Sequence, residues 1–300
     1  MRNGENQRNI TVFGHRGARG IYPENTMAGF QYLQDIGINA VEFDVQNAAN
    51  RITILAHDPH VTMPDGANGE VRSQLIRHTK ATDITKLKVG ALRPGSNYAI
   101  QFPDQARLPD ERIPTFANFC TWAAQHPLLI LNVEVKSHAE QVDLYDPPEM
   151  IVSDVVDLLE KHNLCHRCVL SSFDWRVLLA CAKRAPELTR GYLTLEQNPC
   201  TTLIPNIFDG SSWMGGVTRA DHDGSLPQTI AALGGKVWCP YFKDLTQDAL
   251  VRAQDLGLVV NVWTVNTLDD IHRMADMGVN GIISDYPARV QNVLAQYAGV

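Results

Sequence analysis

The sequence predicts a closed (β/α)8 barrel, and three observations support that fold class. Short apolar runs typical of buried strands alternate with helical patterns along most of the chain. The parallel strands in this alternation number eight when one hairpin is counted as a barrel strand with an antiparallel excursion. Such barrels use about 250 residues as one domain, which suits a chain of 300 residues carrying an insertion. A doubly wound open sheet is the alternative that the same alternation allows.

The chain begins with one strand–helix unit. A β-rich run ends at residues 11–14, and a helical pattern extends from Thr26 to about Ile36. Gly37 stands where the C-terminal cap of this helix is expected, because glycine adopts the left-handed backbone conformation at no steric cost.

The next two apolar runs, residues 39–45 and 51–57, predict a β-hairpin. Only a few small polar residues separate them, whereas a parallel crossover needs about a dozen. A turn near residues 49–50 would place Glu42 roughly opposite His57, so that two polar residues distant in sequence become neighbours.

Residues 59–112 are rich in Gly, Pro, Asp and Asn and show little periodicity. A segment of that length without a regular pattern inside a compact domain is usually a functional lid or an inserted subdomain. We therefore expect one barrel domain over residues 1–300, with an insertion at residues 59–112.

The barrel pattern resumes after the insertion. Thr115 is expected to cap a helix that ends near Gln125, and the apolar run 128–135 suits a strand buried on both faces, which indicates a parallel sheet. Asp146 precedes two prolines and Glu149, a combination that predicts the N-terminus of the next helix.

The remaining strands are expected at residues 169–172, 192–195, 237–239, 259–263 and 281–284. Helices fall between most of them. Thr246 and Thr267 are predicted N-caps, and Asp270 completes a capping box with Thr267. Gly257 and Gly278 stand where these two helices should end.

Composition and charge exclude several classes of protein. With 44% hydrophobic and 20% charged residues the chain can bury a sizeable core, which excludes intrinsic disorder. The balance of 26 basic against 33 acidic residues gives a net charge of -7, which argues against binding to nucleic acid or an anionic membrane through a global positive field. An anionic ligand must therefore be bound by local charges.

The sequence also predicts a cytoplasmic protein. Its first ten residues lack the apolar segment of a secretory signal, and no run approaches the roughly 18 apolar residues of a membrane span. The six cysteines show no framework of spacings, which favours reduced and packed thiols. Cys165 and Cys168 have the spacing of a metal knuckle but lack a second such pair, so we interpret them as structural.

Polar side chains gather at the predicted C-terminal ends of the strands, where (β/α)8 barrels carry their active sites. Glu42 and Asp44 close the second strand and point the same way, since they are two residues apart, and Glu134 ends the next parallel strand. Three carboxylates on converging strands repel one another unless a cation neutralises them. An all-oxygen set of ligands selects Mg²⁺ or Ca²⁺, so we predict one such divalent cation at Glu42, Asp44 and Glu134.

Two histidines flank this predicted site. His15 follows the first strand and His57 ends the hairpin. Because histidine titrates near neutral pH, one could remove a proton from a nucleophile while the other protonates a leaving group. Zinc ligation by both is an alternative that the carboxylates disfavour. Arg16 offers a planar fork for phosphate oxygens, and Lys136 offers a point charge.

Eight short motifs, taken together and in order, resemble the glycerophosphodiester phosphodiesterase family. Single motifs among them are weak signals, but their joint order is very specific, and the likeness runs from residue 11 to about 290. The motifs are His15-Arg16-Gly17, Pro23-Glu24-Asn25-Thr26, Val41-Glu42-Phe43-Asp44-Val45, His57-Asp58, Val133-Glu134-Val135-Lys136, Ser171-Ser172-Phe173, Val262-Trp263-Thr264-Val265-Asn266 and Gly281-Ile282-Ile283-Ser284-Asp285-Tyr286-Pro287.

The resemblance implies a TIM barrel of the phospholipase C-like phosphodiesterase type that hydrolyses glycerophosphodiesters to sn-glycerol 3-phosphate and an alcohol. It implies the same metal ligands, histidines and cations as above. Phe173 and Trp263 are expected to contact the substrate, although Trp263 could equally belong to the core. In the family mechanism the glycerol 2-hydroxyl attacks phosphorus, and water opens the resulting cyclic phosphate.

This chain departs from many relatives at two places. Residues 47–50 replace a Thr-x-Asp-Gly turn, and residues 60–64 replace an Arg-Thr-Thr stretch, so the lid that faces the substrate is expected to differ. Because the insertion leaves directly from His57 and Asp58, we expect it to cover the pocket mouth and to choose the alcohol group.

Three other functions are alternatives. A barrel acting on lysophospholipids or other lipid phosphodiesters would be favoured by an exposed apolar rim on the insertion, whose apolar residues are scattered instead. A catalytically silent barrel that binds a phosphorylated ligand would be expected to lack a histidine or a metal carboxylate, and all are present. An aldolase or isomerase would more often need a Schiff-base lysine or a phosphate-binding glycine loop.

Overall fold

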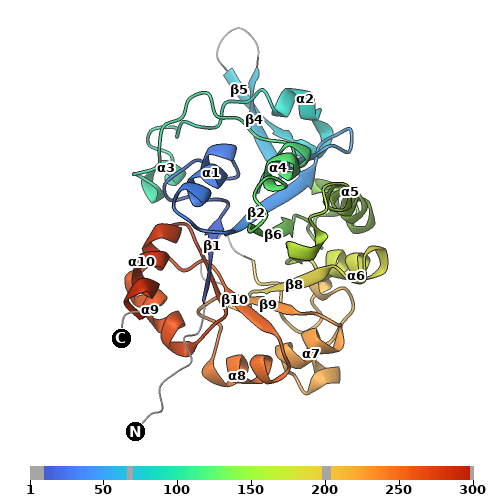
Figure 1. Cartoon of the computed structure of the whole chain (residues 1–300). Coiled ribbons are helices and arrows are strands. Elements are labelled where there is room, and N and C mark those ends of the chain that lie inside the picture. Colours follow the sequence, from blue (N-terminus) through green and yellow to red (C-terminus); the bar gives the residue numbers. More distant parts are fainter. Residues whose placement is uncertain (1–9, 66–69, 198–203, 298–300) are drawn as a thin grey trace.

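The computed structural model describes residues 10–65, 70–197 and 204–297. Eight parallel strands form a barrel that closes because β1 pairs with both β2 and β11, which confirms the predicted fold class and excludes the open sheet (Figure 1). The barrel strands are β1 (Thr11–His15), β2 (Ala40–Asn47), β6 (Ile130–Val135), β7 (Cys168–Ser172), β8 (Thr189–Thr194), β9 (Val237–Pro240), β10 (Val259–Val262) and β11 (Gly281–Ser284).

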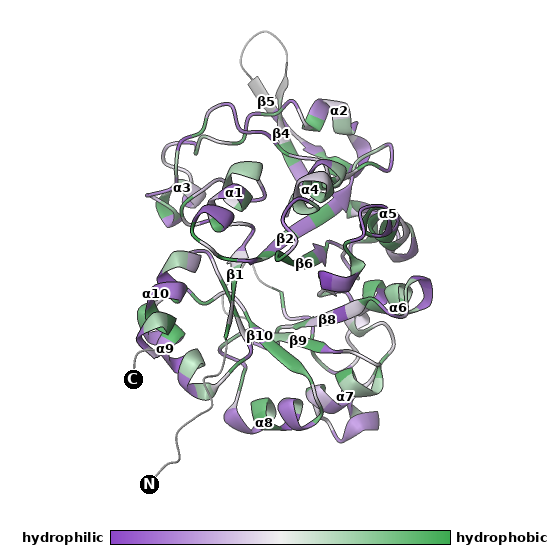
Figure 2. Cartoon of the chain, in the orientation of Figure 1, coloured by the Kyte–Doolittle hydropathy of each residue, from purple (hydrophilic) through white to green (hydrophobic). Residues whose placement is uncertain are grey.

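Helices surround the barrel and pack their apolar sides against the strands (Figure 1). They are α1 (Met27–Asp35), α4 (Phe116–Ala123), α5 (Pro148–Lys161), α6 (Trp175–Arg184), α7 (Leu226–Ala232), α8 (Gln247–Asp255), α9 (Leu268–Met277) and α10 (Pro287–Tyr297). Figure 2 shows β9 and β10 as largely hydrophobic, whereas helices such as α8 alternate between hydrophobic and hydrophilic residues. The main core therefore lies between the strands and the helix layer.

Most of the predicted helix ends are confirmed. Thr115, Thr246 and Thr267 each accept a hydrogen bond from the backbone N–H three residues later. Gly37 and Gly278 have φ of 73° and 83°, the left-handed conformation expected just past a helix.

Asp146 does not cap α5. The N-cap is Pro147, and no side chain caps this helix. Pro148 has no backbone N–H, so one of the two donors that a capping carboxylate at Asp146 would use is missing. The Asp146 carboxylate instead accepts a hydrogen bond from Asn47 at 3.0 Å and pairs with Arg77 at 3.2 Å.

The hairpin after β2 forms, but with a register one residue away from the predicted one. Val45 pairs with Leu55 on β3 (Thr53–Leu55), whereas the predicted register pairs Val45 with Ile54. The difference arises because the turn contains one residue more, over residues 49–51, with Arg51 in the left-handed region at φ 57°. Glu42 consequently has its strand neighbours on β1 and β6 and none on β3.

Residues 59–112 contain regular structure that the sequence pattern did not predict. β4 (His60–Asp65) and β5 (Glu70–Leu75) form a separate antiparallel pair, followed by the short helices α2 (Ala81–Ile84) and α3 (Asn97–Gln101), seen at the top and upper left of Figure 1. Among the described strands, β4 and β5 pair only with each other, and the apolar alternation of Val61 and Met63 on β4 is too short to stand out in a segment rich in Gly, Pro, Asp and Asn. A second, smaller hydrophobic cluster anchors this region and contains Ala48, Ile54, Val61, Ile76, Ala81, Ile84 and Ile113.

Five of the six cysteines are described and all five are unpaired, while Cys200 lies outside the described residues. Cys168 is buried on β7, and burial raises the pKa of its thiol well above the ordinary value. Within the described part of the chain, Cys165 and Cys168 belong to no group that could hold a metal ion. None of the helices described has the length and apolar content needed to cross a membrane.

Candidate active site

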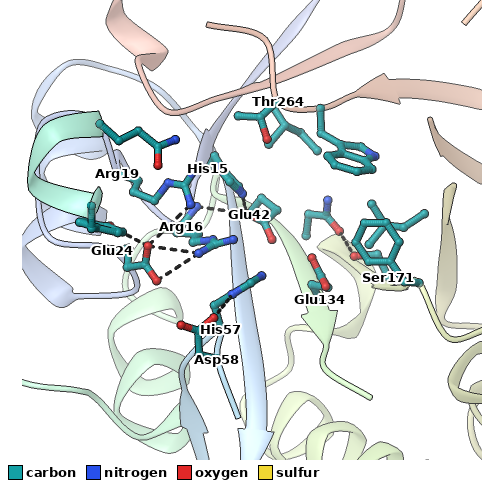
Figure 3. Close-up of a pocket in the computed structure, with 17 residues that line it drawn as sticks. His15, Arg16, Arg19, Glu24, Glu42, His57, Asp58, Glu134, Ser171 and Thr264 are labelled. Atoms are coloured by element: carbon teal, nitrogen blue, oxygen red, sulfur yellow. Dashed lines mark hydrogen bonds and ion pairs between the residues drawn. The ribbon is translucent and has the colours of Figure 1, made fainter. Parts of the chain in front are cut away.

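A cavity of about 410 Å³ opens at the C-terminal end of the barrel strands. Seven of the nine side chains predicted from the sequence meet around it, while Asp44 and Lys136 lie just behind its wall. Figure 3 shows Glu42 and Glu134 directed into this cavity, with His15 above Glu42 and His57 below it in that view. The seven are His15, Arg16, Glu42, His57, Glu134, Phe173 and Trp263.

The three predicted metal ligands form a compact acidic cluster. Glu42 and Asp44 lie on β2, and Asp44 pairs in register with Glu134 on β6. One carboxylate oxygen from each lies within 4.8 Å of the others. All three residues are buried.

The chemistry of this cluster fits a hard divalent cation. Glu42 Oε1 and Asp44 Oδ1 are buried without a hydrogen-bond partner. Burial, together with repulsion from Asp44 and Glu134, raises the pKa of Glu42 well above its ordinary value. A Mg²⁺ or Ca²⁺ ion would remove both the unmet hydrogen-bonding demand and the repulsion, because both ions prefer oxygen ligands.

Two basic side chains already compensate part of this acidic charge. Lys136 Nζ lies 2.5 Å from Glu134 Oε1 and 3.6 Å from Asp44 Oδ1. Arg16 Nε lies 3.2 Å from Asp44 Oδ2. Although burial alone would raise it, these cations and His57 hold the pKa of Asp44 well below its ordinary value. Asn25 fixes the orientation of Asp44, since its amide donates to Asp44 Oδ2 at 2.9 Å and its carbonyl oxygen accepts from the Asp44 backbone N–H.

His15 has the geometry of an oriented general base. Its Nδ1 lies 2.6 Å from Asp285 Oδ1, and its Nε2 faces Glu42 Oε2 at 3.8 Å. The Asp285 carboxylate therefore holds Nδ1 as the protonated nitrogen and leaves Nε2 free to accept a proton. Burial lowers the pKa of His15 to about 4 against the opposing effect of Asp285, so the imidazole is neutral at pH 7.

His57 lies on the opposite side of the cavity and is more accessible. Its side chain is 32% exposed, and its Nδ1 lies 2.7 Å from Asp58 Oδ1. Asp58 is the neighbouring residue and its side chain is 78% exposed. In each of the two histidines Nδ1 contacts a carboxylate, but the His57 side chain is more exposed to solvent than that of His15.

Arg16 is held by carboxylates in this structure. Its Nη1 donates to both oxygens of Glu24 at 3.1 Å, and its backbone N–H donates to Glu42 Oε2 at 3.0 Å. Although burial alone would lower it, Glu24, Asp44 and Glu42 raise the pKa of Arg16 above its ordinary value. The guanidinium is therefore fixed at the cavity edge with its charge intact.

Lys136 lies behind this cavity and lines a second one of about 170 Å³. Phe173 borders both cavities, and its ring meets Trp263 edge to face with centroids 5.1 Å apart. The Trp263 indole donates to the Cys239 carbonyl at 2.8 Å. Trp263 is therefore buried and also forms part of the cavity wall.

Several cavity residues were missed by sequence reasoning. Glu24, Arg19 and Tyr98 form a charged rim in which the Tyr98 hydroxyl donates to Glu24 Oε2 at 2.6 Å. Glu24 belongs to the motif Pro23-Glu24-Asn25-Thr26, so its charge and its place beside Asn25 could have identified it. Asn132 lies two residues before Glu134 on β6 and therefore on the same face of the strand, and its Nδ2 is buried without a partner. Its strand position could have identified it.

The loop that carries these groups after β1 is tightly packed. At Gly14, a Cβ atom would lie 1.9 Å from the Gly17 carbonyl oxygen. The Gly17 N–H in turn donates to the Glu42 carbonyl at 3.3 Å. Only glycine at position 14 allows this loop to lie so close to the strand, which fixes His15 and Arg16 against β2.

Comparison with known proteins gives a consistent result. The model of the glycerophosphoryl diester phosphodiesterase family matches residues 15–289. A glycerophosphodiester phosphodiesterase of Caldanaerobacter subterraneus is 25% identical over 283 residues, which cover 94% of this chain and 97% of the relative.

Solved structures show the same fold. A crystal structure from Silicibacter pomeroyi, of a protein assigned as a glycerophosphoryl diester phosphodiesterase, has a TM-score of 0.81 and 33% identity and covers 96% of this chain and 94% of that one. An Oleispira antarctica phosphodiesterase in complex with the product sn-glycerol-3-phosphate has a TM-score of 0.68 and 23% identity and covers 95% and 96%. The match of the family model across nearly all of the barrel confirms the resemblance, and this chain belongs to the glycerophosphoryl diester phosphodiesterase family.

Proposed function

We propose that this protein is a metal-dependent phosphodiesterase that hydrolyses glycerophosphodiesters to sn-glycerol 3-phosphate and an alcohol. One observation supports this function above all: three buried carboxylates, two of which have an oxygen without a hydrogen-bond partner, lie between two carboxylate-bound histidines at one cavity. Membership of the family supports the same reaction class.

The divalent cation, Mg²⁺ or Ca²⁺, would be held by Glu42, Asp44 and Glu134. When bound, it would supply Lewis-acid polarisation of a phosphoryl oxygen and would lower the pKa of the substrate's 2-hydroxyl group. Arg16 and Lys136 would contribute further positive charge toward the phosphate. Phe173 and Trp263 would provide an apolar wall against the carbon atoms of the substrate.

The two histidines divide the proton transfers in this proposal. His15 Nε2 accepts the proton of the glycerol 2-hydroxyl as that oxygen bonds to phosphorus, and His57 donates a proton to the alcohol oxygen as its bond to phosphorus breaks. In the second stage the roles reverse. His57 accepts a proton from water as water opens the cyclic phosphate, and His15 returns its proton to the 2-oxygen.

We also propose a domain organisation and a cellular location for this chain. The chain would act as one barrel domain, in which residues 59–112 cover the mouth of the cavity. Tyr98 and Gln101 of this insertion line the cavity, which supports that role. We propose a small-molecule diester as the substrate, with no nucleic-acid partner, and a cytoplasmic location that suits the five unpaired cysteines.

Release of glycerol 3-phosphate from a panel of glycerophosphodiesters tests this function. His15→Ala and Glu134→Ala should each abolish the release, whereas the matched control His162→Ala at the end of α5 should keep it. Addition of a chelator should stop the wild-type reaction. Activity that survives both substitutions would contradict the site, and full-rate cleavage of a substrate lacking the 2-hydroxyl would contradict the cyclic intermediate.

A further inference from the structure

The second cavity adjoins the first and has a different character. The two share His57, Asp58, Glu134 and Phe173, so His57 stands at the boundary between them. Beyond this boundary the second cavity is lined by apolar and aromatic side chains, by N–H donors, and by the hydroxyl and amide side chains of Ser137, Tyr145, Ser172 and Asn206. Its volume of about 170 Å³ is below the roughly 300–1,000 Å³ of cavities that enclose drug-sized ligands.

Trp213 gives this cavity an unused hydrogen-bond donor. The residue lies on the short helix η4 (Ser212–Met214), is 7% exposed and lines the cavity. Its indole Nε1 is buried and has no hydrogen-bond partner. A buried donor without an acceptor is unfavourable, and unmet groups of this kind are rare in folded proteins. The indole is therefore suited to an acceptor that a ligand brings.

His138 provides a second donor in the same cavity. Its Nδ1 accepts hydrogen bonds from the backbone N–H groups of Glu140 and Gln141 at 3.2 and 3.0 Å. The neutral ring therefore carries its proton on Nε2. The ring centroids of His138 and Trp213 lie 4.6 Å apart, which places the two rings side by side.

Lys136 sets the charge of this cavity. Its ammonium group lines the cavity and lies 5.9 Å from the Phe173 ring. The nearest acidic partner of that ammonium, Glu134, belongs to the proposed metal cluster. Asp58, the other acidic residue of the lining, points largely to solvent. A cationic group entering the cavity would therefore meet a positive charge and two N–H donors.

We propose that the second cavity binds the leaving alcohol and selects small alcohols that carry additional hydroxyl groups, such as glycerol or inositol, over cationic alcohols such as choline. This inference rests on the proposed function, because His57 at the boundary protonates the leaving oxygen in that mechanism. Hydroxyl oxygens accept from Trp213 and His138, whereas a trimethylammonium group has no acceptor. The small volume also disfavours a lysophospholipid acyl chain.

The test compares kcat/KM for glycerophosphoglycerol and glycerophosphoinositol with kcat/KM for glycerophosphocholine. Wild type should prefer the polyol diesters. Trp213→Phe keeps the aromatic ring and removes the donor, so it should lower kcat/KM for polyol diesters about three- to tenfold and change the choline diester less than twofold. Trp122→Phe is the matched control, because that indole donates to Gln31 on the outside of the barrel.

A binding measurement tests the inference without enzymatic turnover. In a ¹H–¹⁵N spectrum of the wild-type protein, the indole signal that is lost in Trp213→Phe belongs to Trp213. Addition of free glycerol or inositol should shift that signal, and addition of choline should not.

The outcomes separate the two proposals. If wild type cleaves no diester, the proposed function fails, while the indole shift still decides the ligand class. If wild type cleaves all diesters with equal preference and the indole does not respond to polyols, the inference is wrong and the function stands. If Trp213→Phe lowers kcat/KM equally for every diester, the cavity binds the shared glycerol group and not the leaving alcohol, which also overturns the inference.

Discussion

The two walls of the main cavity differ in how completely their polar groups are satisfied. On the wall formed by β1, β2 and β6, Glu42 Oε1, Asp44 Oδ1 and Asn132 Nδ2 are buried without partners. On the wall formed by β7, β9 and β10, the Trp263 indole donates to the Cys239 carbonyl, and Phe173 packs on the Trp263 ring.

This difference indicates that one wall of the cavity is built for function and the other for stability. A buried polar group without a partner costs about 1–3 kcal/mol, so the carboxylate wall gives up stability that the aromatic wall retains. Local rules of folding are commonly broken at functional sites, where a ligand supplies the missing partner. The carboxylate wall should therefore respond to metal and substrate, and the aromatic wall should respond mainly to changes in packing.

Glu42→Gln should produce the largest effect. Loss of one proposed ligand should lower kcat/KM by about 10³-fold, equivalent to about 4 kcal/mol of transition-state stabilisation. The same variant should unfold at a higher temperature than wild type in EDTA, because burial and the neighbouring carboxylates disfavour ionisation of Glu42 in the folded state, whereas glutamine does not ionise. Calorimetry in EDTA checks this result with Glu149→Gln on α5 as control. A lower unfolding temperature for Glu42→Gln would show that the carboxylates do not repel one another.

Metal addition should stabilise the folded protein. A cation at one hundred times its Kd adds about 2.7 kcal/mol to the free energy of unfolding, which thermal unfolding with and without Mg²⁺ or Ca²⁺ measures. Glu134→Gln should remove this response, and Trp263→Phe on the opposite wall should keep it. An equal response in Glu134→Gln and wild type would place the cation elsewhere.

Asp285→Asn should lower kcat by about 10- to 100-fold with little change in KM, because Asp285 orients the His15 ring and does not line the cavity. Asp255→Asn at the end of α8 is the exposed control. Steady-state kinetics across pH 5 to 9 should show that kcat of the variant depends on pH differently from kcat of wild type. An unchanged kcat would mean that His15 needs no carboxylate to hold it.

The smallest effect concerns acid stability. His15 and Arg19 hold the pKa of Asp285 well below its ordinary value against the effect of burial. Asp285 therefore stabilises the folded state above about pH 3.9, the ordinary Asp pKa, and this contribution is lost as the pH falls below it. Urea unfolding between pH 5 and 3 should show a shallower loss of stability in Asp285→Asn, by at most about 1.4 kcal/mol per pH unit. If the free energy of unfolding falls equally steeply with pH in the two proteins, the contacts of Asp285 with His15 and Arg19 do not contribute to acid stability.

Much of the fold follows from local patterns in the sequence. Strand–helix alternation predicted the barrel because buried parallel strands and amphipathic helices have distinct periodicities. The same reasoning missed the β4–β5 pair, whose apolar alternation is short, and placed the N-cap of α5 at Asp146, where Pro148 removes one of the two donors. The hairpin register depended on the left-handed conformation of Arg51, which its residue type does not indicate.

The site was predictable to the extent that strand ends determine it. His15 and Glu134 reach the cavity because they lie at the ends of β1 and β6, whereas Glu42 lies within β2, in the part that pairs with β1 and β6. Lys136 also ends a strand, yet it lines the neighbouring cavity, because its contacts with Glu134 and Asp44 draw it behind the carboxylates. Tyr98 lies 74 residues from Glu24 in the sequence, and only tertiary packing brings such a residue to Glu24.

Lys136 and Arg16 place two positive charges beside the three buried carboxylates before any metal binds. The acidic cluster therefore carries a net charge closer to zero than its three carboxylates suggest. We expect the newly synthesised chain to complete its barrel without a metal ion, unlike small domains that fold only around zinc. Metal supply in the cell would then govern how many molecules are active, and not how many reach the folded state.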